Sequence, residues 1–268
     1  APSGVFEDDL DTYDLDFQHH FQLAERNNVV WGLGYRFTHE VEGNAPSLAF
    51  FPAVQDQNLF SGFLQDEIRL WPDWYFTLGS KVEHNDYTGF EWEPSARLQW
   101  NVTSSQMLWT AVSRAVRTPS RIDRNLSEGE PPYFVLLAGN SDFESEKLIA
   151  YELGYRAQLG PKLSTSISTF YNQYDDVRST SLDPDTVFPL FFQNNLKGET
   201  YGVELSAAYQ LLEWWRLRGG YNYLHEHLYI KSGQTDFNNA LNETADPENQ
   251  FSLRSSMDLP KNTELDAG

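Results

Sequence analysis

Alternating polarity is the feature that most constrains how this chain can fold. In roughly a dozen stretches, such as Tyr151–Gln158 and Tyr201–Leu211, apolar and polar side chains alternate with a period of two. This period places alternate side chains on opposite faces of a β-strand, so each stretch predicts a strand with one apolar and one polar face. Many of the stretches exceed the 5–6 residues of an ordinary soluble strand. They are long enough for the roughly 9–11 residues that a transmembrane β-strand needs.

Short and long connections alternate between these strands. Short connections are predicted at Ala24–Asn28, Pro72–Asp73, Thr103–Gln106, Gly160–Lys162, Leu212–Trp214 and Pro260–Asn262. Between them lie Glu42–Gln57, Asp86–Gly89, Arg117–Ser145, Arg178–Lys197 and Ile230–Glu248, all long except Asp86–Gly89. Outer-membrane barrels have short turns on the periplasmic side and longer loops outside. The pattern therefore predicts an all-β, antiparallel transmembrane β-barrel.

The tryptophans support this interpretation. Of the 8 tryptophans, all but Trp92 lie within about three residues of a short connection. Tryptophan and tyrosine collect at membrane–water interfaces, so the positions predict an aromatic belt at one end of the sheet. A soluble β-sandwich is the alternative, but it gives no reason for tryptophans to gather at one end.

Composition excludes several other classes of protein. The mean hydropathy of −0.54 and the lack of any run of 18 apolar residues argue against transmembrane helices. A net charge of −20 argues against nucleic-acid binding, because phosphates would be repelled. The chain has no cysteine, so it has neither disulfides nor a thiolate metal site. We find no nucleophile-elbow, zinc-helix or phosphate-loop motif, so we expect no enzyme activity, no catalytic residue and no cofactor.

Several segments resemble signatures of TonB-dependent outer-membrane receptors. They are Ser113–Arg121, Tyr151–Arg156 and Gly198–Leu205, together with Tyr13–Arg36 and Asn249–Asp266. The resemblance implies a 22-stranded barrel plugged by a globular domain. On that basis residues 1–268 would form one partial barrel domain of about 11–12 strands, roughly the C-terminal half of the barrel, without the plug. The chain opens in what we predict to be an acidic loop, Glu7–Asp11, and it stops just after Thr263–Asp266, part-way into a new strand. We therefore expect an open, strongly curved sheet whose first and last strands do not pair.

The resemblance also implies a function. It implies active import of a scarce nutrient, an iron–siderophore, cobalamin or similar metal chelate, across the outer membrane of a Gram-negative bacterium. The implied partners are outer-membrane lipid, the small metal chelate and the TonB complex, which would act through the plug domain. A passive 12-stranded porin is the main alternative, and an outer-membrane barrel enzyme is a further one.

Arginines are the candidate site residues. Six are predicted on the polar, lumen-facing side of strands, because an arginine facing lipid at mid-bilayer costs about 2–4 kcal/mol: Arg36, Arg97, Arg156, Arg216, Arg218 and Arg254. They could bind plug carboxylates or an anionic ligand, or merely pair with neighbouring acidic residues. Arg117, Arg121 and Arg124 lie in a long predicted loop, where they could reach an external anionic chelate or remain solvated. No metal ligands are predicted.

Overall fold

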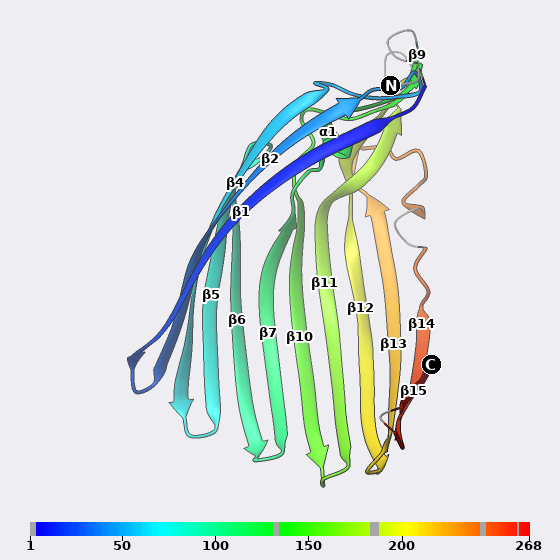
Figure 1. The fold of residues 1–268 in the computed structure, drawn as a ribbon. Helices are drawn as coiled ribbons and strands as arrows, with labels where there is room; N and C mark the ends of the chain where they lie inside the picture. Colours follow the sequence, from blue (N-terminus) through cyan, green and yellow to red (C-terminus); the bar gives the residue numbers. More distant parts are fainter. Residues whose placement is uncertain (1–3, 131–133, 183–187, 242–244, 262) are drawn as a thin grey trace.

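Eleven long strands and the short strand β15 form one antiparallel sheet, in which they lie in their order along the chain (Figure 1). The computed structural model describes residues 4–130, 134–182, 188–241, 245–261 and 263–268. The strands of this sheet are β1 (Glu7–Ala24), β2 (Asn27–Gly43), β4 (Val54–Trp71), β5 (Trp74–Asn85), β6 (Gly89–Thr103), β7 (Gln106–Arg117), β10 (Glu146–Leu159), β11 (Leu163–Leu182), β12 (Leu190–Leu212), β13 (Trp215–Ile230), β14 (Asn249–Leu259) and β15 (Thr263–Ala267). Three short strands and a helix lie beside the sheet: β3 (Leu48–Phe50), β8 (Leu126–Glu130), β9 (Phe134–Ala138) and α1 (Arg121–Asn125).

The sheet is curved and open, as predicted (Figure 1). Among the described residues, β1 pairs only with β2 and β15 pairs only with β14, so the first and last strands do not meet. Short turns lie along the rim shown at the bottom of Figure 1, and the longer connections lie at the opposite rim, which we call the outer end. No helix in the described ranges has the length and apolar character needed to span a membrane.

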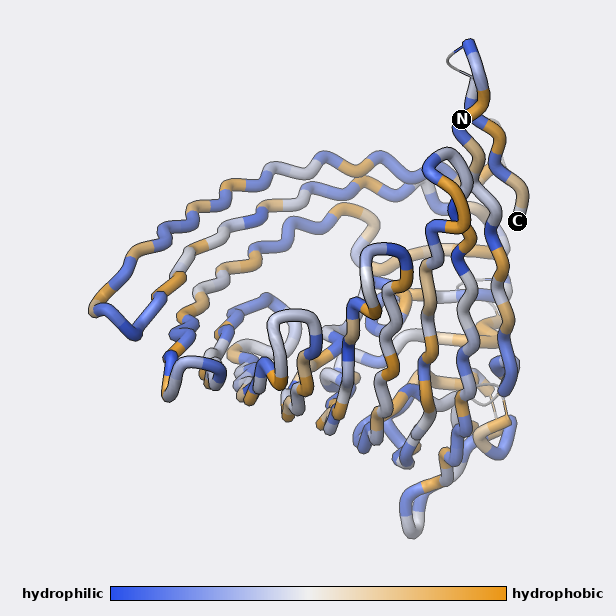
Figure 2. The backbone as a smooth tube through the Cα atoms, turned by 90° about the horizontal axis from the view of Figure 1, so that it is seen from below, coloured by the Kyte–Doolittle hydropathy of each residue, from blue (hydrophilic) through white to orange (hydrophobic). Residues whose placement is uncertain are grey.

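The strand register divides the side chains between two faces. One row of paired residues crosses eight strands, and every member is apolar or aromatic: Trp74, Trp100, Leu108, Tyr155, Ile167, Leu205, Tyr221 and Phe251. We call the side of the sheet that carries this row the apolar face. Five of these side chains are exposed and the other three are partly exposed, as expected of a surface covered by lipid rather than by protein. Figure 2 shows the matching alternation of hydrophilic and hydrophobic residues along the strands.

The opposite side, the polar face, carries the six predicted lumen arginines. A second row, which lies on this face, pairs Arg156, Ser166, Ser206, Gly220 and Ser252. The same alternation puts Arg36, Arg97, Arg216, Arg218 and Arg254 on this face. A hollow of about 720 Å³, lined by residues that include Asp14, Arg36 and Glu83, opens on the polar face between β1, β2, β4 and β5. The predicted division of side chains is confirmed.

The tryptophans near the short turns lie at one end of the sheet, as the belt prediction requires. Trp74 stacks on Trp100 with ring centroids 5.1 Å apart, and Trp71 meets Trp74 edge-on at 6.5 Å. Trp109 lies at the same end but on the polar face, opposite Gln99 and Gly154. A Cβ at position 154 would lie 2.4 Å from the Trp109 ring, so only glycine leaves room for this indole.

At the outer end, the limits of the strands and loops differ from those predicted from the sequence. The acidic segment Glu7–Asp11 belongs to β1, and β11 and β12 extend through much of the predicted 178–197 connection. The segment 117–145, predicted as a loop, contains α1, β8 and β9, and β3 lies within the predicted 42–57 connection. These segments lack strict alternation, because beyond the bilayer neither face of a strand meets lipid. There, buried Asn195 donates hydrogen bonds to the hydroxyl groups of buried Ser179 and Ser181 instead.

Candidate functional site

The outer end carries a small folded unit, which we call the loop cap: β3, α1, β8, β9 and the outer ends of β11 and β12. Strand β8 pairs with β3 and β9, and β9 pairs in parallel with the start of β12. Four side chains form its buried core: Phe50, Leu126, Phe143 and Phe192. The partly buried Phe6, Leu48 and Leu137 pack against this core. Several outer segments, far apart in sequence, thus share one hydrophobic cluster.

Asp123 is a buried, hydrogen-bonded carboxylate within the loop cap. Its side chain is fully buried, and it occupies the third position of α1, where it forms a reciprocal capping box with Ser120. The Asp123 carboxylate accepts hydrogen bonds from the Ser120 backbone amide and hydroxyl at 2.9 Å each, and from Arg117 Nη1 at 3.0 Å. Burial alone would raise the pKa of Asp123, but the hydrogen bonds from Ser120 and Arg117 outweigh it, so the pKa is lowered.

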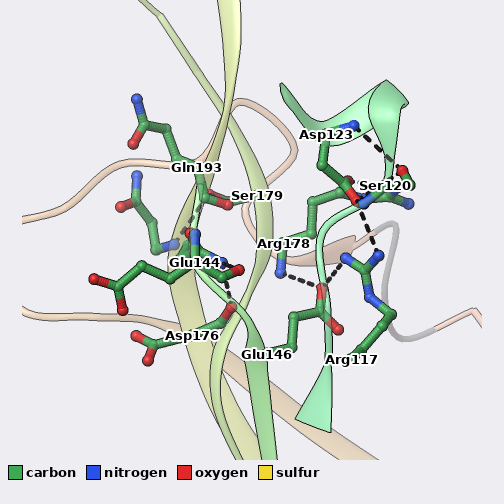
Figure 3. Close-up of polar contacts among 11 residues, drawn as sticks. Arg117, Ser120, Asp123, Glu144, Glu146, Asp176, Arg178, Ser179 and Gln193 are labelled. Carbon is green, nitrogen blue, oxygen red and sulfur yellow. Dashed lines mark hydrogen bonds and ion pairs between the residues drawn. The ribbon is translucent and has the colours of Figure 1, made fainter. Parts of the chain in front are cut away.

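Arg117 and Arg178 connect Asp123 to the sheet (Figure 3). The Arg117 Nη2 donates to Glu146 Oε1 at 2.6 Å, and the backbone amide of Arg178 donates to the same oxygen at 3.0 Å. The Arg178 guanidinium lies 3.6 Å from Asp123 Oδ1. The hydrogen bond to Glu146 raises the pKa of Arg117, so its charge is fixed at any ordinary pH. One network therefore joins β7, α1, β10 and β11.

A second ionic cluster lies beside this network, on β10, β11 and the residue that follows β13. Asp176 breaks the register of β11 in a left-handed conformation, with φ 59°, and it pairs with Lys147 and Lys231. Burial opposes the charge of Asp176, but hydrogen bonds from the two lysines lower its pKa. Lys231 also lies 2.9 Å from Asp175. The bulge therefore points a carboxylate at one lysine of the neighbouring strand β10 and at one lysine just after β13.

Arg121 is buried beneath the loop cap. Its Nη1 lies 3.1 Å from Glu40 Oε1 and 3.7 Å from Glu42 Oε1, and its Nη2 donates to the Pro52 carbonyl. Its guanidinium also lies over the Phe50 ring, 5.3 Å from the centroid. Burial and the nearby carboxyl groups of Glu40 and Asp8 raise the pKa of Glu42 to about 7. Arg121 therefore connects α1 to the outer end of β2.

Arg124 lines an open hollow in the loop cap. The hollow has a volume of about 650 Å³, and its lining includes Arg124, Asn125, Phe134 and Phe188. The Phe134 and Phe188 rings lie 5.9 Å apart, and both side chains are about half-exposed. The Arg124 guanidinium lies 5.0 Å from the centroid of the Tyr87 ring and donates to the Tyr87 carbonyl. Exposed aromatic rings beside a cation form a surface suited to an aromatic, anionic ligand.

The six polar-face arginines do not converge on one point. Arg36 donates to Asp14 at 2.7 Å, and Arg254 pairs with Asp266 at 3.0 Å. Arg97 lies over the Trp109 ring at 4.6 Å, and Arg156 lines a separate hollow near the short turns. Arg218 lies directly opposite Arg254, and Arg216 lies opposite Gln210 and Ser256. The arginines are therefore spread along the polar wall of the sheet.

Sequence reasoning did not single out Asp123, Glu146, Arg178 or Tyr87. The segment Ser120–Asp123 resembles a helix-capping pattern, and this signal could have indicated α1 and the buried carboxylate. Glu146 and Tyr87 gain their partners from segments about 30 to 40 residues away, and no local pattern records such contacts.

The family model described as "TonB dependent receptor-like, beta-barrel" matches residues 1–263 of the chain. The chain belongs to the TonB-dependent receptor family. The iron-regulated outer membrane virulence protein of Vibrio cholerae is 26% identical over 179 residues, which are 62% of this chain and 27% of that protein. The ferric enterobactin receptor of Pseudomonas aeruginosa is 28% identical over 156 residues, 54% of this chain and 21% of that protein.

Solved structures share the fold of this receptor chain. The siderophore receptor PirA from Acinetobacter baumannii superimposes with a TM-score of 0.71 at 16% identity, covering 97% of this chain and 42% of that one. The ferric enterobactin receptor of Pseudomonas aeruginosa superimposes with a TM-score of 0.70 at 19% identity, covering 95% of this chain and 40% of that one. The chain thus spans about a quarter of the curated relatives and less than half of the solved chains.

The family assignment favours a receptor over the two alternatives, an outer-membrane enzyme and a passive porin. The family is one of receptors rather than enzymes, and one relative is named as an outer membrane protein, so this chain is an outer-membrane β-barrel segment. The porin alternative is not favoured, because the family model and the relatives describe receptors.

Proposed function

We propose that this chain forms part of the wall and outer loops of an active receptor for a ferric chelate, and that TonB energises transport through a plug domain. The two curated relatives carry names that refer to iron regulation and to ferric enterobactin. The observation that carries the proposal is the hollow in the loop cap, where Phe134 and Phe188 expose aromatic surface beside Arg124. A catecholate chelate of iron offers both aromatic rings and negative charge to such a surface.

The arginines divide into two proposed roles. Arg124 lines the hollow, so we assign it to ligand contact. Arg117 and Arg121 have carboxylate partners, so their proposed contribution is to hold the loop cap in shape. We propose that the six polar-face arginines offer bidentate donors to carboxylates of a plug domain or to the passing anionic chelate.

Binding of ferric enterobactin should depend on the aromatic rim of the hollow. In the full-length receptor, we expect Phe134→Ala to weaken binding by roughly two- to tenfold, since one aromatic contact contributes about 0.5–1.5 kcal/mol. Quenching of tryptophan fluorescence by the ferric chelate would measure the change in Kd.

The matched control is Phe237→Ala, which removes an exposed phenyl ring from a different outer connection, outside the lining of the hollow. Its Kd should equal that of the wild type. If the two variants bound ferric enterobactin equally well, the hollow would not be the ligand site.

A further inference from the structure

Three carboxylates converge at the outer end of β1 and β2, where the sequence did not predict a metal site. One oxygen each from Asp8, Glu40 and Glu42 lies within 4.8 Å of the others. Asp8 lies directly opposite Glu42 in the strand register, and Glu40 is two residues away on the same face. Like charges directly opposite each other destabilise a strand pair. The arrangement therefore needs positive charge nearby to offset this repulsion.

Glu42 is the second, independent sign that a ligand belongs here. Its side chain is only 3% exposed. Within the part of the chain that the structure describes, its Oε2 is buried and accepts no hydrogen bond. A buried carboxylate oxygen without a donor costs free energy that the fold must recover elsewhere. A cation among the three carboxylates would supply that missing partner.

Arg121 does not balance the cluster by itself. It brings one positive charge to three carboxylates, which leaves a net charge of −2 when all three are ionised. Its Nη1 is near Glu40 and Glu42, but the Nε and Nη1 groups of Arg121 make no hydrogen bond of acceptable geometry within the described residues. One guanidinium beside three carboxylates requires a further charge of +2 for neutrality, which is the charge of one divalent cation.

Gln55, on the strand next to Glu40, carries a further buried oxygen without a hydrogen-bond donor among the described residues. It lies directly opposite Glu40 on β4, and its Nε2 donates to the Tyr87 hydroxyl at 3.1 Å. This donation turns the amide so that Oε1 is buried, and no donor among the described residues reaches it. Carboxylate and amide oxygens are the ligands that calcium prefers, and calcium tolerates irregular cages of six to eight oxygens.

We propose that Asp8, Glu40 and Glu42 bind a calcium ion, with Gln55 as a neighbouring oxygen donor. The ion joins the edge strand β1 to β2 directly beneath the loop cap. Asp8 comes from β1, Glu40 and Glu42 come from β2, and Arg121 comes from α1. Binding therefore fastens the outer ends of β1 and β2 to the part of the receptor that contacts ligand. This inference does not depend on the identity of the transported chelate.

Calorimetric titration of the purified full-length receptor with calcium chloride, after removal of metals with EDTA, tests the proposal. We expect Asp8→Asn to weaken one calcium site by at least about 10–100-fold, the loss caused even by outer-shell partners of a metal. Asp8 is exposed, so this variant should fold. Glu42→Gln should weaken the same site, and in both variants calcium should no longer raise the thermal unfolding midpoint as it does in the wild type.

The control is Asp9→Asn, which removes the same charge from the adjacent residue of β1, whose side chain points to the other face. It should bind calcium as the wild type does. Identical titrations of the wild type and Asp8→Asn would overturn the proposal, as would the absence of any calcium-dependent heat or stabilisation in the wild type.

Discussion

Replacing Leu205 with arginine is expected to destabilise the membrane-embedded receptor by about 2–4 kcal/mol, the cost of an arginine on the lipid face near mid-bilayer. Leu205 lies in the interior of β12, in the row of apolar side chains that crosses eight strands, and its side chain is exposed. On the apolar face, the exposed part of this side chain meets lipid. Urea unfolding of the full-length receptor in lipid vesicles would measure the loss.

The adjacent residue supplies a matched control. Ser206 points to the polar face, in the row that contains Arg156 and Ser252, so Ser206→Arg places the same side chain at nearly the same depth in a hydrated environment. We expect its effect to stay within about 0.5 kcal/mol. Equal destabilisation by the two substitutions would mean that the two faces do not differ in environment, and the membrane orientation of the sheet would be wrong.

Removing the Asp123 carboxylate should loosen the loop cap. Asp123→Ala takes away the acceptor shared by Ser120 and Arg117, and it leaves the amino end of α1 without its capping box. Leaving a buried hydrogen-bonding group without its partner costs about 1–3 kcal/mol of stability. Arg117 and Arg178 are partly exposed, so water can replace part of the hydrogen bonding that they lose. Amide hydrogen exchange across α1 and β8 should therefore accelerate by roughly five- to 150-fold, the kinetic equivalent of that free energy.

The stabilisation of the loop cap by Asp123 should also depend on pH, in a direction that follows from its pKa. Because the pKa of Asp123 is depressed in the folded cap, its contribution to stability is fully present above the ordinary value of 3.8 and declines as the pH falls through the lower, folded pKa. The protection that Asp123 confers should disappear below that point. Asp142→Ala, which removes an exposed carboxylate from the same connection, should leave exchange unchanged. If Asp123→Ala exchanged no faster than Asp142→Ala, the network would not hold the cap.

The part of the fold that faces lipid could be predicted from the sequence, because lipid imposes a period of two on every strand. Leu205 and Ser206 are assigned to opposite faces by alternation alone, and the register agrees. Near the outer end this constraint disappears. Glu7–Asp11 carries too much charge to suggest a strand, yet it pairs with residues 39–43 of β2. Backbone pairing continues there without any matching side-chain pattern.

The candidate site was only partly predictable for a related reason. Arg124 was identified by its charge and its place in a long connection, and it does line the hollow. Phe134 and Phe188 come from two separate connections and meet only after the loop cap has folded. Asp123 and Glu42 depend in the same way on partners from other strands, so their burial cannot be read from neighbouring residues.

Uptake of radioactive iron tests the central claim most directly. The full-length receptor would be expressed in a Gram-negative host that lacks its own ferric enterobactin receptor, with and without a functional TonB. The proposed function predicts saturable accumulation of iron supplied as ferric enterobactin, and loss of that accumulation when TonB is absent, while binding at the cell surface persists. Equal, non-saturable iron entry with and without TonB would contradict it and would indicate a passive pore.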